Sequence, residues 1–188
     1  FKGVCDRLAE AGFIALAPVL LDGATADTVG AAEALLAGAD ANSLAHLTRS
    51  SLATLRAVPG VMAGPVGIVG FSMGASLGLW LSGRVVDEIA ATVAFYGGQE
   101  TDLQGATSAY LGHYAEHDPY VDADELVLLE ADLHLLDLAP TFHHYPGTHH
   151  WFAEDDRPEY DPEAAALAWE RTLAFLRRHL PPSPDAAP

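Results

Sequence analysis

The sequence has little cysteine, little positive charge and no long apolar run. Cys5 is the only cysteine among 188 residues, so no internal disulfide and no cysteine-rich metal cluster can form. Lysine and arginine number 9 against 26 aspartate and glutamate residues, which gives a formal net charge of −17. This charge repels nucleic acid and anionic lipid. We therefore expect neither a nucleic acid nor a membrane as partner, and a reducing, cytoplasmic location fits the single cysteine.

The sequence lacks the signals of a membrane span and of a leader, and its composition suits a single domain. No apolar run approaches the roughly 20 residues that cross a bilayer, and no basic-then-apolar leader is present. Half of the residues are hydrophobic, which suits one compact domain over residues 1–180. The Pro- and Ala-rich residues 181–188 are expected to be disordered. The chain opens at Phe1 within a helical pattern and without Met, so we expect further residues upstream.

Short apolar runs alternate with helical patterns along the chain. Five runs bounded by Gly, Pro or Asp are typical of strands, namely residues 13–19, 66–71, 90–96, 110–114 and 141–145. Three longer segments have helical spacing, namely residues 42–58, 122–137 and 161–180. In the second of these, leucines recur every three or four residues, at Leu126, Leu129, Leu133 and Leu136. The alternation predicts an α/β fold with a mostly parallel sheet covered by helices on both faces.

A serine stands between two glycines where the strand pattern at 66–71 ends. Gly70, Ser72 and Gly74 match Gly-x-Ser-x-Gly, with a strand expected before the motif and a helix after it. This nucleophile elbow strains the serine backbone, so the positions two before and two after must be small. A glycine-rich turn without a catalytic role is the alternative. In the catalytic interpretation, Ser72 is the nucleophile and the Met73 N–H is an oxyanion donor.

A serine hydroxyl is a good nucleophile only when a base takes its proton and an acid orients that base. In this architecture the acid and then the base follow the serine along the chain. Asp118 follows the strand pattern at 110–114, whereas the alternatives Asp122 and Asp124 better suit caps of the next helix. Two histidines, His149 and His150, follow the last strand pattern, and both are candidates for the base.

Four segments resemble the dienelactone hydrolase family of α/β-hydrolases and together span nearly the whole chain. They are CDRLAEAGFIALAP, VGFSMG, GHYAEHDPYV and YPGTHHWFAEDDRPEYDPEAAALAWERTLAFL. The resemblance implies that Asp118 is the acid, with Val121 following it. It also implies that His150 is the base, in a frame formed by Tyr145, Gly147 and Phe152.

The resemblance implies an α/β-hydrolase fold and the hydrolysis of a small-molecule ester or lactone without a cofactor or metal. Phe71, Trp151 and Phe152 are candidates for the substrate pocket. Complete family members begin with further strands, and the loop after one of them supplies an oxyanion amide. We therefore expect that N-terminal strands are missing from these 188 residues. The oligomeric state does not follow from the sequence.

The chain departs from the family pattern in its nucleophile and in its charges. The best-known members carry a cysteine nucleophile, whereas Ser72 needs both the histidine and the aspartate for activation. Members that act on dienelactone hold its carboxylate with arginines, one of them shortly after the base. Glu154 occupies that place here, so we expect neutral esters or lactones as substrates. Arg157 is expected to pair with the acidic run at 155–156.

Two other functions stay open from the sequence. A hydrolase-like domain that has lost catalysis and binds a ligand or partner would account for the missing second oxyanion donor. Metal binding would use several of the histidines, namely His113, His117, His143, His144, His149 and His150. Neighbouring strand residues point to opposite faces, so His143 and His144 do not easily reach one ion. We expect one of these two rings in the core and the other in solvent.

Overall fold

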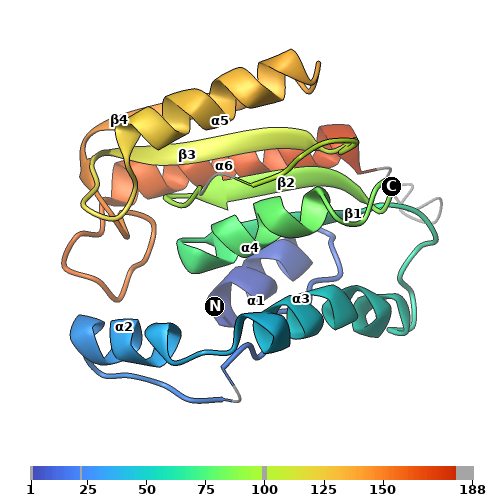
Figure 1. Cartoon of the computed structure of the whole chain (residues 1–188), viewed down its shortest axis with the longest axis horizontal. Helices are drawn as coiled ribbons and strands as arrows, with labels where there is room; N and C mark the ends of the chain where they lie inside the picture. The colour runs from blue at the N-terminus through green and yellow to red at the C-terminus, as the bar shows by residue number, and fades with distance from the viewer. Residues whose placement is uncertain (1, 22, 99–100, 181–188) are drawn as a thin grey trace. The chain divides into compact units, whose positions relative to one another are not determined.

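The computed structural model describes residues 2–21, 23–98 and 101–180 (Figure 1). The chain divides between Ala63 and Gly64 into two compact units, and each is described by itself. The expectation of one domain over residues 1–180 stays a prediction. The expected disorder of residues 181–188 concerns a segment outside the described ranges. Within those ranges, no helix is both long enough and apolar enough to cross a membrane.

The described part of the first unit is helical. It contains α1 (Lys2–Glu10), α2 (Val29–Ala37) and α3 (Ala41–Arg56). Thr28 caps α2 and Asp40 caps α3, and each side chain accepts a hydrogen bond from the backbone N–H three residues on. These caps satisfy donors that have no partner within the helix.

The expectation of a strand at residues 13–19 is wrong. These residues carry no regular secondary structure. A strand needs a neighbour that pairs with its N–H and C=O groups. The regular elements among the described residues of this unit are all helices, so the run has no strand partner there. An apolar run with strand-like composition is therefore not sufficient to make a strand.

The second unit is built on a four-stranded sheet with the order β1-β2-β3-β4. The strands are β1 (Val66–Phe71), β2 (Ile89–Phe95), β3 (Ala109–His117) and β4 (Thr141–His149). All three neighbouring pairs are parallel. The helices of this unit are α4 (Met73–Ser82), α5 (Ala123–Leu135) and α6 (Pro162–His179). The α/β class and the four strands expected after residue 63 are confirmed.

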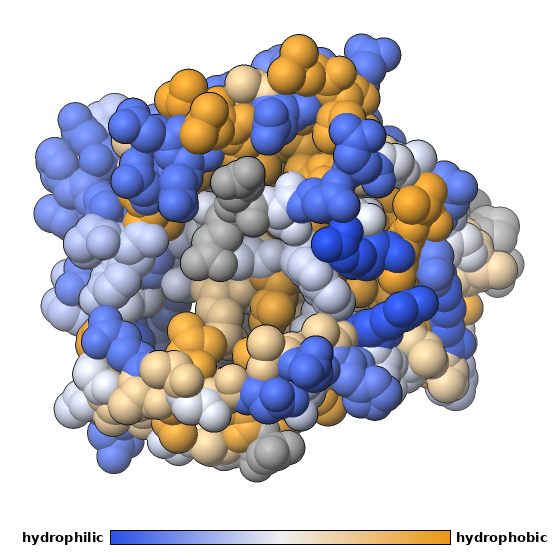
Figure 2. All heavy atoms as spheres, viewed as in Figure 1, coloured by the Kyte–Doolittle hydropathy of each residue, from blue (hydrophilic) through white to orange (hydrophobic). Residues whose placement is uncertain are grey.

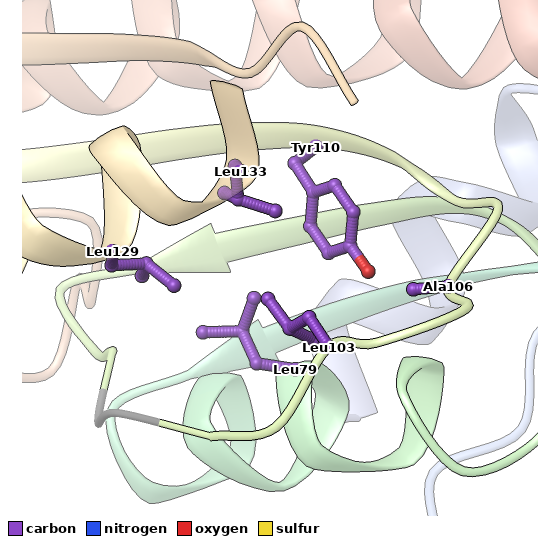
Figure 3. Close-up of a cluster of buried hydrophobic side chains, with 6 residues drawn as sticks. All are labelled: Leu79, Leu103, Ala106, Tyr110, Leu129 and Leu133. Carbon is purple, nitrogen blue, oxygen red and sulfur yellow. The ribbon is translucent and has the colours of Figure 1, made fainter. Parts of the chain in front are cut away.

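Helices cover both faces of this sheet, as the sequence predicts (Figure 1). On one face, α4 and α5 pack with β3 in a buried apolar cluster of Leu79, Leu103, Ala106, Tyr110, Leu129 and Leu133 (Figure 3). On the other face, α6 packs against β2 and β3, and its Thr172 hydrogen-bonds to His113 of β3. The sheet is therefore the middle layer of three, which places its carboxyl edge at the end of a rigid core.

Helix α5 is apolar on its outer side as well as on its inner side. Leu126, Leu129 and Leu133 are buried, as their spacing predicts. The opposite side exposes Val127, Leu128 and Leu135, and Figure 2 shows apolar surface over α5 at the top of the view. Since both sides are apolar, it is the packing against the sheet that identifies the inner one.

Candidate active site

Four side chains stand at the carboxyl edge of the sheet, each as the first residue after a strand. Ser72 follows β1, Tyr96 follows β2, Asp118 follows β3 and His150 follows β4. The register pairs Phe71 with Phe95 and His117 with His149, so the ends of each of these strand pairs are level. Parallel strands place their carboxyl ends at one edge, where ligands bind in sheets of this type.

The backbone at Ser72 has the left-handed geometry of a tight strand-to-helix turn, with φ 50° and ψ −120°. A Cβ at Gly70 would collide with the backbone of Gly74 and lie 2.6 Å from Ala75 Cα, so the turn requires glycine there. A Cβ at Gly74 itself would meet nothing within 4 Å, so the structure does not require a small residue at that position. A Cβ at Gly97, which follows β2, would collide with the Ser72 carbonyl oxygen.

The imidazole of His150 joins Ser72 to Asp118. Its Nδ1 lies 2.9 and 2.8 Å from the two carboxylate oxygens of Asp118, and its Nε2 lies 3.1 Å from Ser72 Oγ. A carboxylate can only accept, so Nδ1–H donates to Asp118 and Nε2 is left to accept the Ser72 hydroxyl proton. The side chains of His150 and Asp118 are 3% and 7% exposed. The three residues form one hydrogen-bonded chain, in the order expected from the sequence.

The rival residues lie elsewhere. His149 is exposed, and its ring centroid lies 5.2 Å from that of His117. Asp122 caps α5 by accepting the Asp124 N–H at 2.8 Å, and Asp124 belongs to the first turn of that helix. The structure therefore brings Asp118 and His150 to Ser72, and none of these alternatives.

The residues next to His150 form a second polar group. The Tyr96 hydroxyl donates to Glu154 Oε1 at 2.9 Å. Burial raises the pKa of Tyr96, and the Glu154 charge acts in the same direction. Burial also raises the pKa of the Glu154 carboxyl. Arg157 lies 3.9 Å from Glu154 and 4.7 Å from the Trp151 ring centroid, which corrects its expected pairing with residues 155–156.

The three candidates for the substrate pocket differ in exposure. Phe152 is fully buried and packs against Tyr96 and Tyr145, which makes it a core residue. Phe71 is buried and stacks on Phe95 with ring centroids 4.5 Å apart. Trp151 is partly exposed and contacts the His150 ring. Among the three, Trp151 is the one with exposed surface, and its role in a substrate pocket stays a prediction.

A cavity and a pair of histidines are two further features of the second unit. A cavity of about 820 Å³ borders Asp118 and Tyr120, but its lining includes neither Ser72 nor His150. His143 stacks on His113 and His144 lies against Tyr114, on opposite faces of β4 as expected. His143 is half-buried and His144 is exposed. Within the described ranges, no three His, Cys, Asp or Glu side chains are arranged to hold a metal ion.

Three residues next to the site were not identified from the sequence, namely Tyr96, Gly97 and Tyr120. Tyr96 and Gly97 belong to the run FYGG at the end of β2, where a glycine pair after a strand signals close backbone approach. The Tyr120 N–H donates to Asp118 Oδ1 at 2.9 Å. The motif Asp-Pro-Tyr indicates a turn there but does not indicate that its tyrosine meets His150.

Comparison with known proteins finds a family model, relatives and a solved structure that match most of the chain. The model of the "Dienelactone hydrolase family" matches residues 1–180. The "Putative carboxymethylenebutenolidase" of Aquifex aeolicus is 26% identical over 186 residues, 95% of this chain and 80% of that protein. The "Probable 2-oxo-3-(5-oxofuran-2-ylidene)propanoate lactonase" of Bradyrhizobium is 30% identical over 202 residues, 95% of this chain and 78% of that one. The crystal structure of a "Putative Dienelactone Hydrolase" from Klebsiella pneumoniae superposes with a TM-score of 0.81 at 23% identity, covering 93% of this chain and 79% of that chain.

Proposed function

Because the chain belongs to the dienelactone hydrolase family of ester and lactone hydrolases, we propose that it is a serine hydrolase whose nucleophile is Ser72. The observation that supports this is the hydrogen-bonded chain from Asp118 through His150 to Ser72. Such a chain supplies the base and the orienting acid that a serine hydroxyl requires. The strained backbone of Ser72 adds support, since strain of this kind is typical of functional sites.

In the acylation step, Ser72 Oγ attacks the carbonyl carbon of an ester or lactone. As the new O–C bond forms, the hydroxyl proton moves to His150 Nε2 and the carbonyl π electrons move to the oxygen. His150 then gives the proton to the leaving oxygen as the old C–O bond breaks. An acyl-enzyme remains, together with a released alcohol or, from a lactone, an opened chain with a terminal hydroxyl.

Deacylation repeats the same proton transfers with water. His150 Nε2 takes a proton from water, the hydroxide attacks the acyl carbon, and the proton returns to Ser72 Oγ as the acyl bond breaks. The Met73 N–H is the proposed oxyanion donor in both steps. It stands at the first position of α4, where a helix has no preceding carbonyl to accept it and where the helix dipole favours negative charge.

We infer a preference for neutral esters or lactones over anionic ones. Two carboxylates stand close to His150, namely Asp118 directly and Glu154 behind Tyr96, whereas Arg157 is already engaged by Glu154. An anionic substrate would meet repulsion from Glu154. The names of the two relatives above, in contrast, include lactones that carry a carboxylate. A pair of lactones that differ only in one carboxylate tests this preference, and Glu154→Gln is expected to narrow the difference in kcat/KM.

The proposed nucleophile is tested by covalent labelling of the full chain. A fluorophosphonate probe is expected to label Ser72 with one adduct per chain, as read by mass spectrometry of a peptide digest. Ser72→Ala should abolish both labelling and turnover of p-nitrophenyl acetate, whereas Ser76→Ala, one helical turn further on, should retain both. A folded chain that is neither labelled nor active would overturn the proposal and favour the ligand-binding module.

A cytoplasmic location, proposed from the single cysteine, is tested separately by fractionation of the source cells.

A further inference from the structure

Three aromatic rings enclose the imidazole of His150, in addition to its two hydrogen-bonded partners. The ring centroids of Tyr96, Tyr120 and Trp151 lie 4.9, 4.8 and 4.8 Å from that of His150. We name these three rings the aromatic cage. They come from the segments that follow β2, β3 and β4, so three separate parts of the sequence meet at one imidazole.

Two of the three cage residues have a backbone conformation that aromatic residues rarely adopt. Tyr96 has φ 35° and Trp151 has φ 69°. Of the six non-glycine residues with positive φ in the described ranges, three are at this site, the third being Ser72. Such strain persists where the surrounding structure compensates for it, and it clusters at functional sites. A glycine at either position would relieve the strain but would remove a ring from His150.

Neighbouring contacts hold each ring in place. Tyr96 is fully buried and its hydroxyl donates to Glu154. The Tyr120 backbone N–H donates to Asp118, and the Tyr120 ring lies 5.3 Å from the Trp151 ring. The cage is therefore built into the same loops that carry the hydrogen-bonded chain.

In the mechanism above, His150 is neutral at rest and becomes positively charged when it takes the Ser72 proton. Aromatic rings attract a cation that lies within about 6 Å of the ring centroid. We propose that the aromatic cage stabilises the imidazolium of His150, so that Tyr96, Tyr120 and Trp151 are positioning residues that act through it. This proposal rests on the proposed function.

The cleanest variant leaves the charged and polar groups near the imidazole in place, because they act on the same proton. The Asp118 carboxylate contacts the ring directly, and the Glu154 carboxylate lies behind the Tyr96 ring. The Arg157 guanidinium lies at the Trp151 ring. The Ser72 hydroxyl faces Nε2. Replacing Tyr120 leaves all four groups in place, and Tyr120 is 49% exposed, so the variant is expected to fold.

The experiment measures kcat/KM of the full chain for p-nitrophenyl acetate between pH 5 and pH 9, with Tyr120→Leu and Tyr120→Phe as a matched pair. Tyr120→Leu removes the ring, so the plateau should fall about threefold, the size of a single exposed cation–π contact. The acid limb, where the base becomes protonated, should move about half a pH unit lower, because the protonated form has lost a stabilising contact. Tyr120→Phe keeps the ring and should restore most of the rate and the original limb.

The Trp151 ring provides a second pair, Trp151→Leu and Trp151→Phe, with the same expected directions. Trp151→Leu also removes the ring that the Arg157 guanidinium contacts, whereas Trp151→Phe keeps a ring there. The double variant with leucine at both positions should lose about tenfold in the plateau and move the limb by about one pH unit, since each ring acts on the same charge. A fall in the plateau with an unmoved limb would indicate a purely structural role and would overturn the cage. The cage would also be overturned if the leucine and phenylalanine variants at one position had the same plateau of kcat/KM and the same acid limb.

Labelling separates this outcome from a failure of the proposed function. If wild-type chain reacts with the fluorophosphonate at Ser72 and shows an acid limb that neither leucine variant moves, the cage alone is wrong. If Ser72 of folded wild-type chain is not labelled and no hydrolysis is seen, the proposed function and the cage fail together.

Discussion

The second unit contains two buried histidines, His113 and His150. Their side chains are both buried, but their hydrogen-bond partners differ. His113 lies between the sheet and α6, with Nδ1 2.8 Å from the Tyr145 hydroxyl and Nε2 3.0 Å from the Thr172 hydroxyl. His150 lies at the edge of the sheet, between the Asp118 carboxylate and the Ser72 hydroxyl. Both rings are almost inaccessible, and both have two hydrogen-bonded nitrogens. The two histidines differ because one partner of His150 is a carboxylate, whereas both partners of His113 are hydroxyls.

That difference decides what each ring can do with a proton. The Tyr145 oxygen accepts from the Arg171 guanidinium and can give its own proton to His113 Nδ1, and in that tautomer the Nε2–H donates to Thr172. Burial lowers the pKa of His113 to about 3, and His143 and Arg171 act in the same direction. His113 therefore stays neutral and joins β3, β4 and α6. The carboxylate beside His150 compensates a positive charge, which is what a general base requires.

The largest expected effect is the loss of hydrolytic activity when His150 is replaced. His150→Gln should lower kcat/KM for p-nitrophenyl acetate by about 10⁴-fold or more, because removal of the base from such a triad has effects of this order. Its matched control is His149→Gln, one residue earlier and exposed, which should stay within twofold of wild type. Activity that survives His150→Gln and is lost in His149→Gln would reverse the assignment.

The next largest expected effect is on the pH dependence of the free energy of unfolding, and it concerns His113. The pKa of His113 is lower in the folded chain than in the unfolded chain, so its stability contribution is complete above pH 6.5 and is lost as the pH falls toward 3. Between pH 7 and pH 4 this loss amounts to about 3 kcal/mol in the free energy of unfolding.

Urea unfolding at both pH values, for wild type and for His113→Gln, measures this contribution. The glutamine keeps a polar side chain at the site and does not titrate, so the variant should lose less stability than wild type over this range. Equal losses in the two proteins would contradict the interpretation that His113 is a neutral clamp.

The smallest effect concerns the attachment of α6 to His113. Thr172→Val removes the hydroxyl and leaves the Nε2–H buried without a partner, at a cost of about 1–2 kcal/mol in the free energy of unfolding. Thr172→Ser keeps the hydroxyl and should recover most of this loss. Hydrolysis by folded Thr172→Val should match wild type, because this contact is not part of the chain to Ser72. A large fall in kcat without a fall in stability would link the two regions instead.

Sequence reasoning performed well where one local motif contained the information. The turn chemistry at Ser72 is contained in the five residues 70–74, and the backbone there has the strained geometry that the motif predicts. The assignment of Asp118 as acid and His150 as base follows from the family resemblance and stays a prediction. The N-cap at Asp161 and the proline after it likewise predict the start of α6, where the Asp161 side chain accepts two backbone N–H groups. The turn at Ser72 and the cap at Asp161 each involve groups only a few residues apart.

Sequence reasoning failed where the outcome depends on a distant partner. Residues 13–19 have the composition of a strand, but the described part of their unit offers no strand to pair with. Tyr96 carries no motif of its own, and its contact with His150 exists because β2 and β4 belong to one sheet. The sequence offers His113 only as a candidate metal ligand, whereas in the structure it is a neutral hydrogen-bonding centre.

The sequence by itself determined the class of fold after residue 63 and the nature of the turn at Ser72, because period, turn residues and caps act over a few neighbouring residues. The tertiary structure decided which histidine meets the serine, which one is a clamp, and which rings surround the base. Those outcomes depend on strand register and helix packing, which bring together residues far apart in the sequence. A side chain's partner, and with it its protonation and its role, is set by that packing.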